Sequence, residues 1–463
     1  MKRLSKNLLS LFTADIARRL LGFISVAYLA RILGKESFGT VYLGFAVLAY
    51  IMVLSGAGFP TLGTKKIAQG ESAELVGQVI AGRFITTVLV FLIDIGVVLL
   101  AVQNSTVAWI IVLFSCAVLP QIFFVDWFFQ GKETLGIVSV ARVAQALVYL
   151  AVVLIFVRSA GDMIWVPLGS IAGECAASAL LFLRFRTVYP GVPLHLKPSL
   201  SLLKQSMPLA VGIILTTLVT NYPSFALGIF KTMSDVGTYS AASKPVYFLL
   251  MGDRVLILLL LPASVRKFSD DPDKFRRMLT DAMRWILIMS MPVALGGILI
   301  ASKLIPIIYG VGYESSIPVF QVFIWYFFVT MLHTVYLAGL IGVNEDKSFG
   351  NNMLVTAVLY LLTVTAGVYW WGPMGAACGV VLSETASVFL MRHALQRTIS
   401  LPVPEKIIRV ILSVAVMGAS VAGALPYGLV AGILTGIVCY SIMLFLSRAV
   451  VWDDVKTLLA RFS

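Results

Sequence analysis

Apolar segments long enough to cross a lipid bilayer recur along this sequence from one end to the other. About 20 apolar residues form a helix that spans the roughly 30 Å hydrocarbon core of a bilayer. Within that core the backbone must satisfy its own hydrogen bonds, so such segments are expected to be helical. The chain of 463 residues is 59% hydrophobic and only 12% charged. We therefore predict an all-α integral membrane fold.

The basic residues predict how the chain is oriented. If residue 1 is cytoplasmic, about 25 of the 35 Lys and Arg residues, Arg83 among them, fall in cytoplasmic loops and span ends. The positive-inside rule then places both termini in the cytoplasm. The same rule explains the net charge of +13, so no nucleic-acid partner is expected. We predict about fourteen spans, at about 8–33, 39–59, 77–101, 106–129, 136–157, 163–183, 206–230, 236–261, 281–301, 317–342, 350–371, 373–391, 406–424 and 427–447.

An internal repeat divides these spans into two halves. Gly39-Thr40 matches Gly237-Thr238, and Glu174 matches Glu384, at offsets of 198 and 210 residues. These offsets are close to the length of six spans, and an even number of spans gives both halves the same orientation in the membrane. We therefore expect two six-helix lobes related by a pseudo-two-fold axis along the membrane normal. The predicted parts are an N-lobe at 1–183, a cytoplasmic linker at 184–205, a C-lobe at 206–397, and the last two spans with a cytoplasmic tail at 398–463.

Three short motifs resemble one known family. They are the segment 31–39 (RILGKESFG), the segment 127–131 (WFFQG) and the segment 237–242 (GTYSAA). In these motifs and in span number the chain resembles the O-antigen flippase (Wzx-type) branch of the multidrug/oligosaccharidyl-lipid/polysaccharide flippase superfamily. The resemblance implies a protein of the cytoplasmic (inner) membrane that moves undecaprenyl-diphosphate-linked oligosaccharide outward by alternating access. Other polysaccharide-assembly proteins are implied as partners.

Charged residues inside the first span demand an explanation. Asp15, Arg18 and Arg19 lie within about five residues of one another, on one helix face. Each charge costs on the order of 3 kcal/mol at the membrane centre, so these side chains should face protein or water. One interpretation is a local ion pair, with one arginine reaching the headgroups. The other is a hydrated cavity that handles a charged substrate.

Five cations within the spans suit a diphosphate ligand. Arg18, Arg19, Arg142 and Arg254 keep their charge and can fork onto phosphate oxygens, and Lys244 offers a point charge from the opposite half. The alternative for Lys244 is an ion pair with an acid on a neighbouring helix. For Arg142 and Arg254 the alternative is extension towards the cytoplasmic headgroups.

Three carboxylates are candidates for coupling transport to an H⁺ or Na⁺ gradient. Asp15, Glu174 and Glu384 lie within spans, where a carboxyl group in low dielectric can exchange a proton near neutral pH. The alternative for the two glutamates is hydrogen bonding between helices. His333 is expected to be a satisfied interior histidine. Pro223 interrupts the seventh span and is a hinge candidate, with a passive kink as the alternative.

No catalytic pattern accompanies these residues. The sequence contains no GxxxxGK[ST] phosphate loop and no clustered His/Cys metal spacing, so we expect neither an enzyme nor a cofactor. Aromatic residues near predicted span ends are expected at the membrane interface, with sugar stacking as the alternative; they are Trp127, Phe128, Trp325, Tyr326, Trp370 and Trp371. The rival functions are a cation-coupled multidrug exporter and a peptidoglycan-precursor (lipid II) flippase. A membrane glycosyltransferase is disfavoured, because the predicted external loops are too short for its chemistry.

Overall fold

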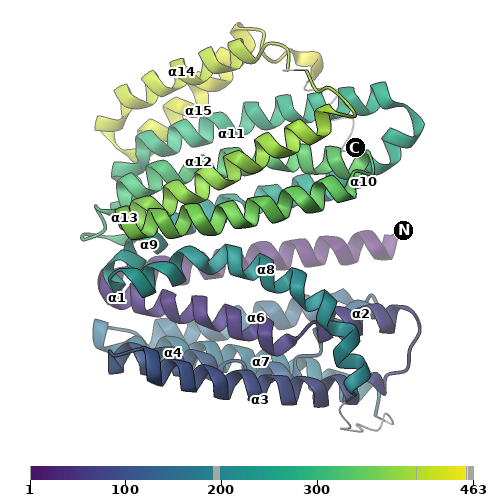
Figure 1. Ribbon diagram of the computed structural model, residues 1–463. Coiled ribbons are helices and arrows are strands. Elements are labelled where there is room, and N and C mark those ends of the chain that lie inside the picture. The colour runs from purple at the N-terminus through teal and green to yellow at the C-terminus, as the bar shows by residue number, and fades with distance from the viewer. Residues whose placement is uncertain (1, 191–198, 403, 455, 457–463) are drawn as a thin grey trace. The chain divides into compact units, whose positions relative to one another are not determined.

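The computed structural model describes residues 2–190, 199–402, 404–454 and 456, and these ranges contain helices and no β-strand (Figure 1). Twelve helices in these ranges are long and apolar enough to cross a membrane. The prediction of an all-α integral membrane fold is therefore confirmed. The number fourteen stays a prediction, although two of the twelve, α1 (Lys2–Gly56) and α13 (Asp346–Gln396), each break at a glycine, Gly34 and Gly372.

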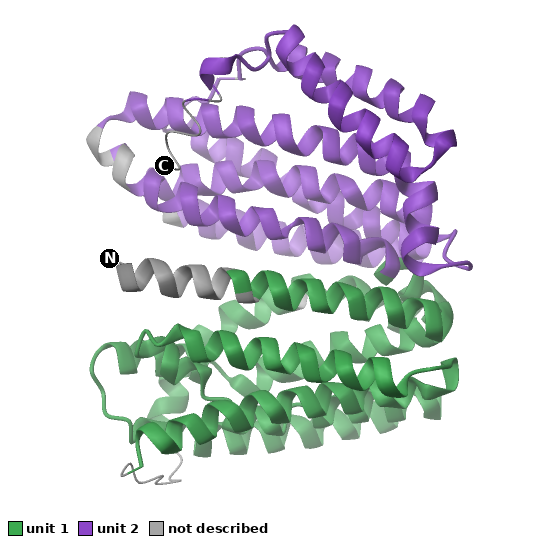
Figure 2. Cartoon of the chain, turned by 180° about the vertical axis from the view of Figure 1, so that it is seen from behind, with its two compact units in different colours: residues 1–240 green, residues 241–463 purple. Residues whose placement is uncertain are grey.

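Two compact units divide the chain, residues 1–240 and residues 241–463 (Figure 2). In the first unit α1 contacts α3, α4, α6 and α8, and α6 packs along α7. The elements of this unit after α1 are α2 (Phe59–Ala68), α3 (Leu75–Ala101), α4 (Ser105–Cys116), η1 (Pro120–Phe123), α5 (Asp126–Gly131), α6 (Leu135–Phe156), η2 (Ala160–Ile164), α7 (Trp165–Val188), α8 (Leu200–Phe230) and the beginning of α9 (Met233–Leu249).

Helix α8 packs inside the first unit, against α1, α2 and α3. A Cβ atom at Gly58 would lie 2.2 Å from the carbonyl oxygen of Ser206, so α8 approaches the corner between α1 and α2 closely. Tyr50 of α1 and Phe225 of α8 pack edge to face with ring centroids 5.4 Å apart. The compact division thus falls after residue 240, whereas the sequence places the lobe boundary at 184–205. The assignment of six spans to each lobe stays a prediction.

Two glycines that the sequence repeat equates lie in contact in the first unit. A Cβ atom at Gly39 of α1 would lie 1.8 Å from the carbonyl oxygen of Met233, and one at Gly237 of α9 would lie 2.1 Å from that of Lys35. Any side chain at either position would therefore strike backbone. Small residues let helix backbones approach in this way inside membranes, and this contact gives the two matching motifs a structural role.

The predicted fourth span, 106–129, is not one continuous helix. α4 ends at Cys116, the 3₁₀ helix η1 begins at Pro120, and the short α5 follows. Proline inside a helix removes a backbone donor and clashes with the preceding turn, which accounts for the break. Trp127 and Phe128 of α5 are 1% and 0% exposed, and Gly63 of α2 makes room for the indole. The prediction that these two aromatic residues lie at the membrane interface is wrong, because α5 folds into the interior of the first unit.

The second unit is built around α12 (Ser316–Gly342), which contacts α10, α11 and α13. The last two helices, α14 and α15, pair with each other and pack on α11. The apolar cluster between them includes Ile288, Val414 and Leu444. The other elements of this unit are α10 (Met251–Asp270), α11 (Pro272–Tyr309), α14 (Ile407–Ala424), η3 (Leu425–Tyr427) and α15 (Leu429–Leu446).

The segment after α15 is held against α11 by one arginine. The Nη2 atom of Arg284 donates to the carbonyl oxygen of Ala449 at 2.5 Å and to the Asp454 carboxylate at 2.7 Å. The Asp454 carboxylate also accepts from the backbone N–H of Val451 at 3.1 Å. This arrangement fixes the chain beyond the last helix to the body of the second unit.

Helix α13 is a hairpin of two arms that meet at Gly372. A Cβ atom at Gly375 would lie 1.8 Å from the carbonyl oxygen of Gly367, and the Thr363 hydroxyl donates to the carbonyl oxygen of Gly379 at 3.0 Å. These pairs are symmetric about residue 371, as antiparallel arms require. A straight helix of 50 residues would be about 75 Å long, more than twice the roughly 30 Å hydrocarbon core. The break at Gly372 therefore lets both arms fit the membrane.

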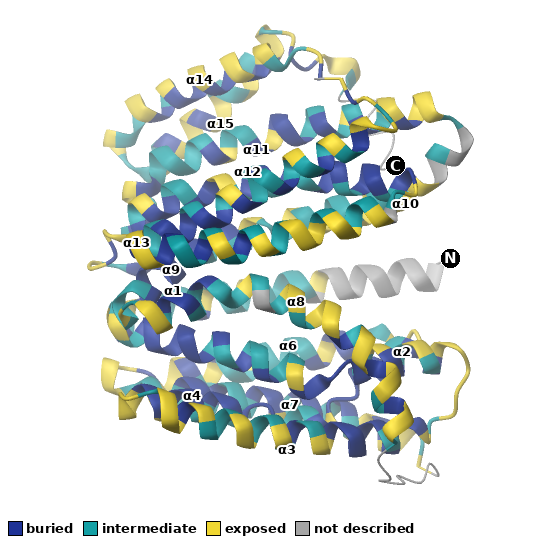
Figure 3. Cartoon of the chain, viewed as in Figure 1, coloured by how far each residue is buried: buried dark blue, intermediate teal, exposed yellow. Residues whose placement is uncertain are grey.

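Exposed residues recur along α3 (Figure 3), and many of them are apolar. Leu92, Leu99 and Leu100 of this helix are 61%, 61% and 91% exposed. Such an exposed apolar surface is unfavourable in water and favourable against lipid chains. The exposed faces, together with the twelve apolar helices of the described ranges, show a multi-pass membrane protein.

Candidate functional site

Asp15 in the first half of α1 holds both neighbouring arginines. Its Oδ1 atom accepts from Nη2 of Arg18 at 3.0 Å, and its Oδ2 atom accepts from Nε of Arg19 at 2.9 Å. Spacings of three and four residues place the three side chains on one helix face. The local ion pair that the sequence allowed is therefore present. It does not exhaust the role of Arg18, which also lines a pocket.

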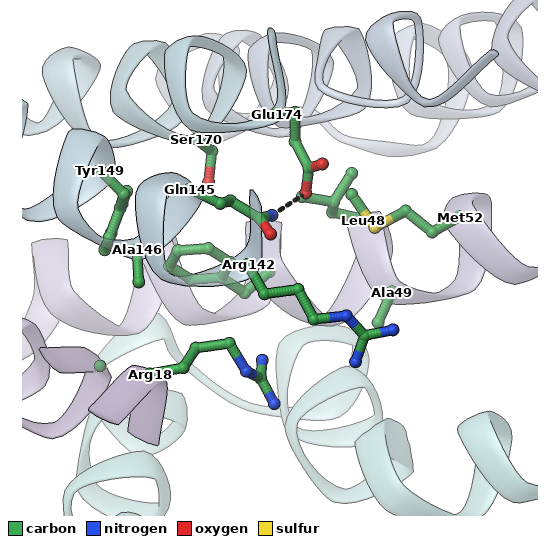
Figure 4. A pocket seen from close by; sticks show the side chains of 12 residues that line it. Arg18, Leu48, Ala49, Met52, Arg142, Gln145, Ala146, Tyr149, Ser170 and Glu174 are labelled. Atoms are coloured by element: carbon green, nitrogen blue, oxygen red, sulfur yellow. Dashed lines mark hydrogen bonds between the residues drawn. The ribbon is translucent and has the colours of Figure 1, made fainter. Parts of the chain in front are cut away.

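A pocket of about 340 Å³ lies in the first unit between α1, α6 and α7 (Figure 4). The side chains of Arg18 from α1 and Arg142 from α6 both extend into it, and Glu174 from α7 adds a carboxylate. The structure thus brings together two of the five predicted cations. The other lining residues are Gly22, Phe45, Leu48, Ala49, Met52, Gln145, Ala146, Tyr149 and Ser170.

Two amide side chains occupy the carboxylate of Glu174. Nε2 of Gln121 donates to Oε2 at 2.5 Å, and Nε2 of Gln145 donates to Oε1 at 2.5 Å, the contact drawn in Figure 4. Gln121 in turn accepts from Nη2 of Arg83 at 3.5 Å, which fixes the orientation of its amide. Both carboxylate oxygens therefore accept a hydrogen bond from an amide side chain. Glu174 is therefore a fixed acceptor on the pocket wall.

Arg83 lies inside the first unit and is only 4% exposed. Its Nη1 atom donates to the carbonyl oxygen of Phe124 at 2.9 Å, in the segment between η1 and α5. The negative charges of Asp126 and Glu174 act on its guanidinium. The sequence counted Arg83 with the cytoplasmic span ends, and its depth in the membrane stays a prediction; the structure adds that it lies buried within α3 and compensates buried acids there. Its place seven residues into the predicted span 77–101 was the available signal.

Asp126 begins α5 and joins this network to the pocket. Its carboxylate accepts from Nη2 of Arg142 at 3.0 Å and from Nε2 of Gln130 at 2.9 Å. The side chain of Asp126 is 11% exposed and that of Arg142 is 42% exposed. The ion pair therefore anchors Arg142 from the protein side while part of its guanidinium faces the pocket.

A second group of polar side chains lies in the second unit. Nδ1 of His333 on α12 and Oε1 of Glu384 on α13 are 2.6 Å apart. The neighbouring hydroxyl of Thr334 donates to the carboxylate of Asp253 on α10. The sequence left His333 as an interior residue, whereas the structure pairs it directly with one of the carboxylates predicted to couple transport to an ion.

The remaining predicted residues are not among those that line the pocket of the first unit. Lys244 is half-buried on α9, and Arg254 is exposed on α10. Pro223 lies inside α8, which runs without a break from Leu200 to Phe230. Just before it, Nδ2 of Asn221 donates to the carbonyl oxygen of Thr217 at 3.1 Å. A hinge at Pro223 stays a prediction.

Sequence reasoning missed the neutral part of the pocket. Gln121 and Gln145 hold Glu174, and the rings of Phe45 and Tyr149 meet edge to face at 6.1 Å along the wall. Glutamines inside predicted spans were a usable signal, because a buried amide needs partners. The aromatic residues were not distinguishable from ordinary interior residues. Chemically, the pocket offers forked cations for an anion and amides and hydroxyls for a hydroxylated ligand.

Comparison with solved structures places the fold. The lipid II flippase MurJ in an inward closed conformation superposes with a TM-score of 0.71 at 14% identity, covering 94% of this chain and 97% of that one. An inward-facing multidrug resistance transporter of the MATE family superposes with a TM-score of 0.66 at 15% identity, covering 82% and 96%. The chain therefore has the fold of these transporters.

Comparison with sequences identifies the family. The chain is 22% identical to the "Putative O-antigen transporter" of Shigella dysenteriae, over 85% of this chain and all of that one. It is 25% identical to the lipopolysaccharide biosynthesis protein WzxC of Escherichia coli (strain K12), over 80% and 76%. The family model described as "Polysaccharide biosynthesis protein" matches residues 4–266, more than half of the chain. The chain belongs to the polysaccharide biosynthesis protein family, as the resemblance of its motifs implied.

Proposed function

We propose that this protein is a flippase that moves an undecaprenyl-diphosphate-linked oligosaccharide across the cytoplasmic (inner) membrane by alternating access. The family and the names of the relatives support transport of a lipid-linked polysaccharide unit. The observation that carries the proposal to this chain is the pocket that both Arg18 and Arg142 line. Forked guanidinium groups bind the paired oxygens of a diphosphate, and a fully apolar pocket would not.

The five predicted cations have different roles in this proposal. Arg18 and Arg142 bind the diphosphate, and Arg19 helps to hold Asp15 and thereby the orientation of Arg18. Lys244 and Arg254 belong to the second unit and contact the anion at another stage of transport. The pocket amides and hydroxyls then suit the first sugar.

Transport is coupled to an ion gradient, H⁺ or Na⁺, through one of the buried carboxylates. The candidates are Asp15, Glu174 and Glu384, and each has a different set of partners. Two arginines occupy Asp15 and two amides occupy Glu174, whereas a titratable histidine faces Glu384. The N-lobe and C-lobe alternate around the substrate, with Pro223 as a hinge and both termini in the cytoplasm.

Transport by purified protein in liposomes tests the proposal. Wild type should move a fluorescent undecaprenyl-diphosphate oligosaccharide between leaflets, and the double variant Arg18→Ala/Arg142→Ala should lose at least about tenfold in rate. A charge-assisted hydrogen bond is worth about 1.5–3 kcal/mol and about 1.4 kcal/mol is tenfold. The matched control is Arg158→Ala, an exposed arginine in the loop after α6, which should transport at the wild-type rate.

Two other results would redirect the assignment. Export of a cationic dye without movement of any lipid-linked sugar would replace the flippase with the multidrug exporter. Movement of lipid II in preference to the oligosaccharide would replace the substrate with a peptidoglycan precursor. Full transport by the folded double variant would remove the diphosphate from this pocket.

A further inference from the structure

The second unit contains a histidine and an acid that form a buried pair between two helices. Nδ1 of His333 and Oε1 of Glu384 are 2.6 Å apart, and their side chains are only 15% and 14% exposed. At this distance a proton lies between the two atoms. In the neutral imidazole, Nδ1–H donates to the ionised carboxylate, and the lone pair is then on Nε2.

The other ring nitrogen has no partner. Nε2 of His333 is buried and makes no hydrogen bond with the described part of the chain. A buried polar atom left unpaired is unfavourable, so such a site calls for an explanation. A second proton on Nε2 would convert the imidazole into an imidazolium beside a carboxylate, and the ionic hydrogen bond would then be stronger.

Burial opposes a second proton on His333, and the negative charges around the pair favour it. Glu384 on α13 and Asp253 on α10 both act on His333 with negative charge. Arg254, also on α10, acts on Asp253 and is exposed. The hydroxyl groups of Tyr326 on α12 and of Tyr247 on α9 are further titratable groups of this neighbourhood. Two carboxylates therefore act on His333, whereas Arg254 acts on Asp253.

The repeat-related glutamate in the first unit has different chemistry. Both oxygens of Glu174 are occupied by amide donors that do not titrate. Glu384 stands at the matching position of the second repeat and faces a side chain that changes charge near neutral pH. The structure therefore distinguishes two carboxylates that the sequence presents as equivalent.

We propose that His333 and Glu384 form a proton-binding site through which the proposed flippase draws on a proton gradient. The proton binds the lone pair of Nε2 while Nδ1–H stays on Glu384, and the pair changes from net charge −1 to zero. Release returns the same proton from Nε2 to water when the second unit opens. Na⁺ is not the ion, because hard cations prefer a set of oxygen ligands and an imidazole nitrogen occupies one oxygen of Glu384. Only the transport experiment that tests this inference rests on the proposed function.

The first test observes the imidazole without any substrate. The chain has three histidines, so ¹⁵N-histidine NMR of the detergent-solubilised protein can be assigned with the variants His333→Gln and His393→Gln. His333 should show Nδ1–H neutral imidazole that gains a proton between about pH 5 and 8, and Glu384→Gln should move that transition to lower pH. A His333 signal that keeps one charge state throughout this range, or that is protonated on Nε2 when neutral, would overturn the proposal.

The second test compares driving forces in liposomes. A proton gradient should accelerate flipping by wild type, and His333→Gln and Glu384→Gln should lose that acceleration while they still flip slowly without a gradient. His393→Gln is the matched control and should respond as wild type does. A Na⁺ gradient that drives wild type, or a normal proton response in both variants, would refute the proton site. Absence of flipping by wild type under every gradient would instead refute the proposed function and leave the NMR result standing.

Discussion

Replacement of Gly39 by alanine should destabilise the first unit. The new Cβ atom would lie 1.8 Å from the carbonyl oxygen of Met233 and 2.8 Å from the backbone nitrogen of Gly237. Both neighbours are backbone, so no side chain can rotate away. The first contact must lengthen by about 1.6 Å to reach the 3.4 Å at which ordinary packing begins. Overpacking of this kind typically costs about 1–3 kcal/mol.

The matched control is Gly96→Ala on α3. Gly96 has a helical environment, and a Cβ atom there would have nothing within 4 Å. Alanine should be neutral or stabilise by up to about 1 kcal/mol, because glycine is the poorer helix former. The two variants therefore make the same chemical change in opposite surroundings.

Thermal unfolding followed by tryptophan fluorescence in detergent measures the difference. The first unit has 240 residues, and for cooperative units of about this size 1 kcal/mol shifts Tm by about 2–4 °C. A cost of about 2 kcal/mol for Gly39→Ala therefore predicts a Tm lower by about 4–8 °C. If both alanine variants unfolded within about 1 °C of wild type, the close approach of α1 and α9 would be refuted.

Two further perturbations follow from the buried charges. Arg83→Met should destabilise the protein by about 3–5 kcal/mol because it leaves buried acids without their cation. Adding Glu174→Gln should restore about 1–3 kcal/mol of that loss, which a double-mutant cycle of Tm values would show. Strictly additive effects of the two substitutions would contradict the network. Burial alone would raise the pKa of Asp454, but hydrogen bonds from Val451 N–H and from Arg284, together with the arginine charge, lower it overall. Because the folded pKa is the lower one, the stabilisation is complete above the ordinary value near 3.8 and is lost as the pH falls through the folded pKa. Asp454→Asn should therefore lower the stability by about 0.5–1 kcal/mol near pH 7, with solvent screening included. Melting curves should show a stability difference between wild type and variant that is constant down to about pH 5 and disappears below about pH 4. A difference that increased in acid would contradict the lowered pKa of Asp454.

Hydropathy was sufficient for the fold class and insufficient for the paths of individual helices. Apolar runs of membrane length specify helices whatever their neighbours are, and the structure confirms twelve such helices in its described ranges. The break in the predicted span 106–129 comes at Pro120, which the sequence contains, but the burial of Trp127 against Gly63 depends on packing that a linear pattern does not contain. Contacts between distant segments decide these details.

The candidate site was predictable in its charges and not in its pairings. Arg18, Arg142 and Glu174 stand out because charged residues are expensive inside a membrane. Arg18 pairs with Asp15 and Arg142 with Asp126, whereas two glutamines, Gln121 and Gln145, hold Glu174. Gln121 in turn accepts from Arg83, which the topology count assigned to a span end. Charge alone shows that a residue must be compensated, and only the fold shows by which side chain.

The α13 hairpin decides how the topology of this chain can be mapped. A reporter enzyme fused after truncation at residue 371 would follow the first arm alone. That arm would then present Thr363 and Gly367, which normally pack on Gly379 and Gly375, to lipid. An arm without its partner has no reason to keep its native depth or orientation. Reporters should therefore be inserted into the full-length chain, or fused beyond Arg397, where both arms enter the membrane together.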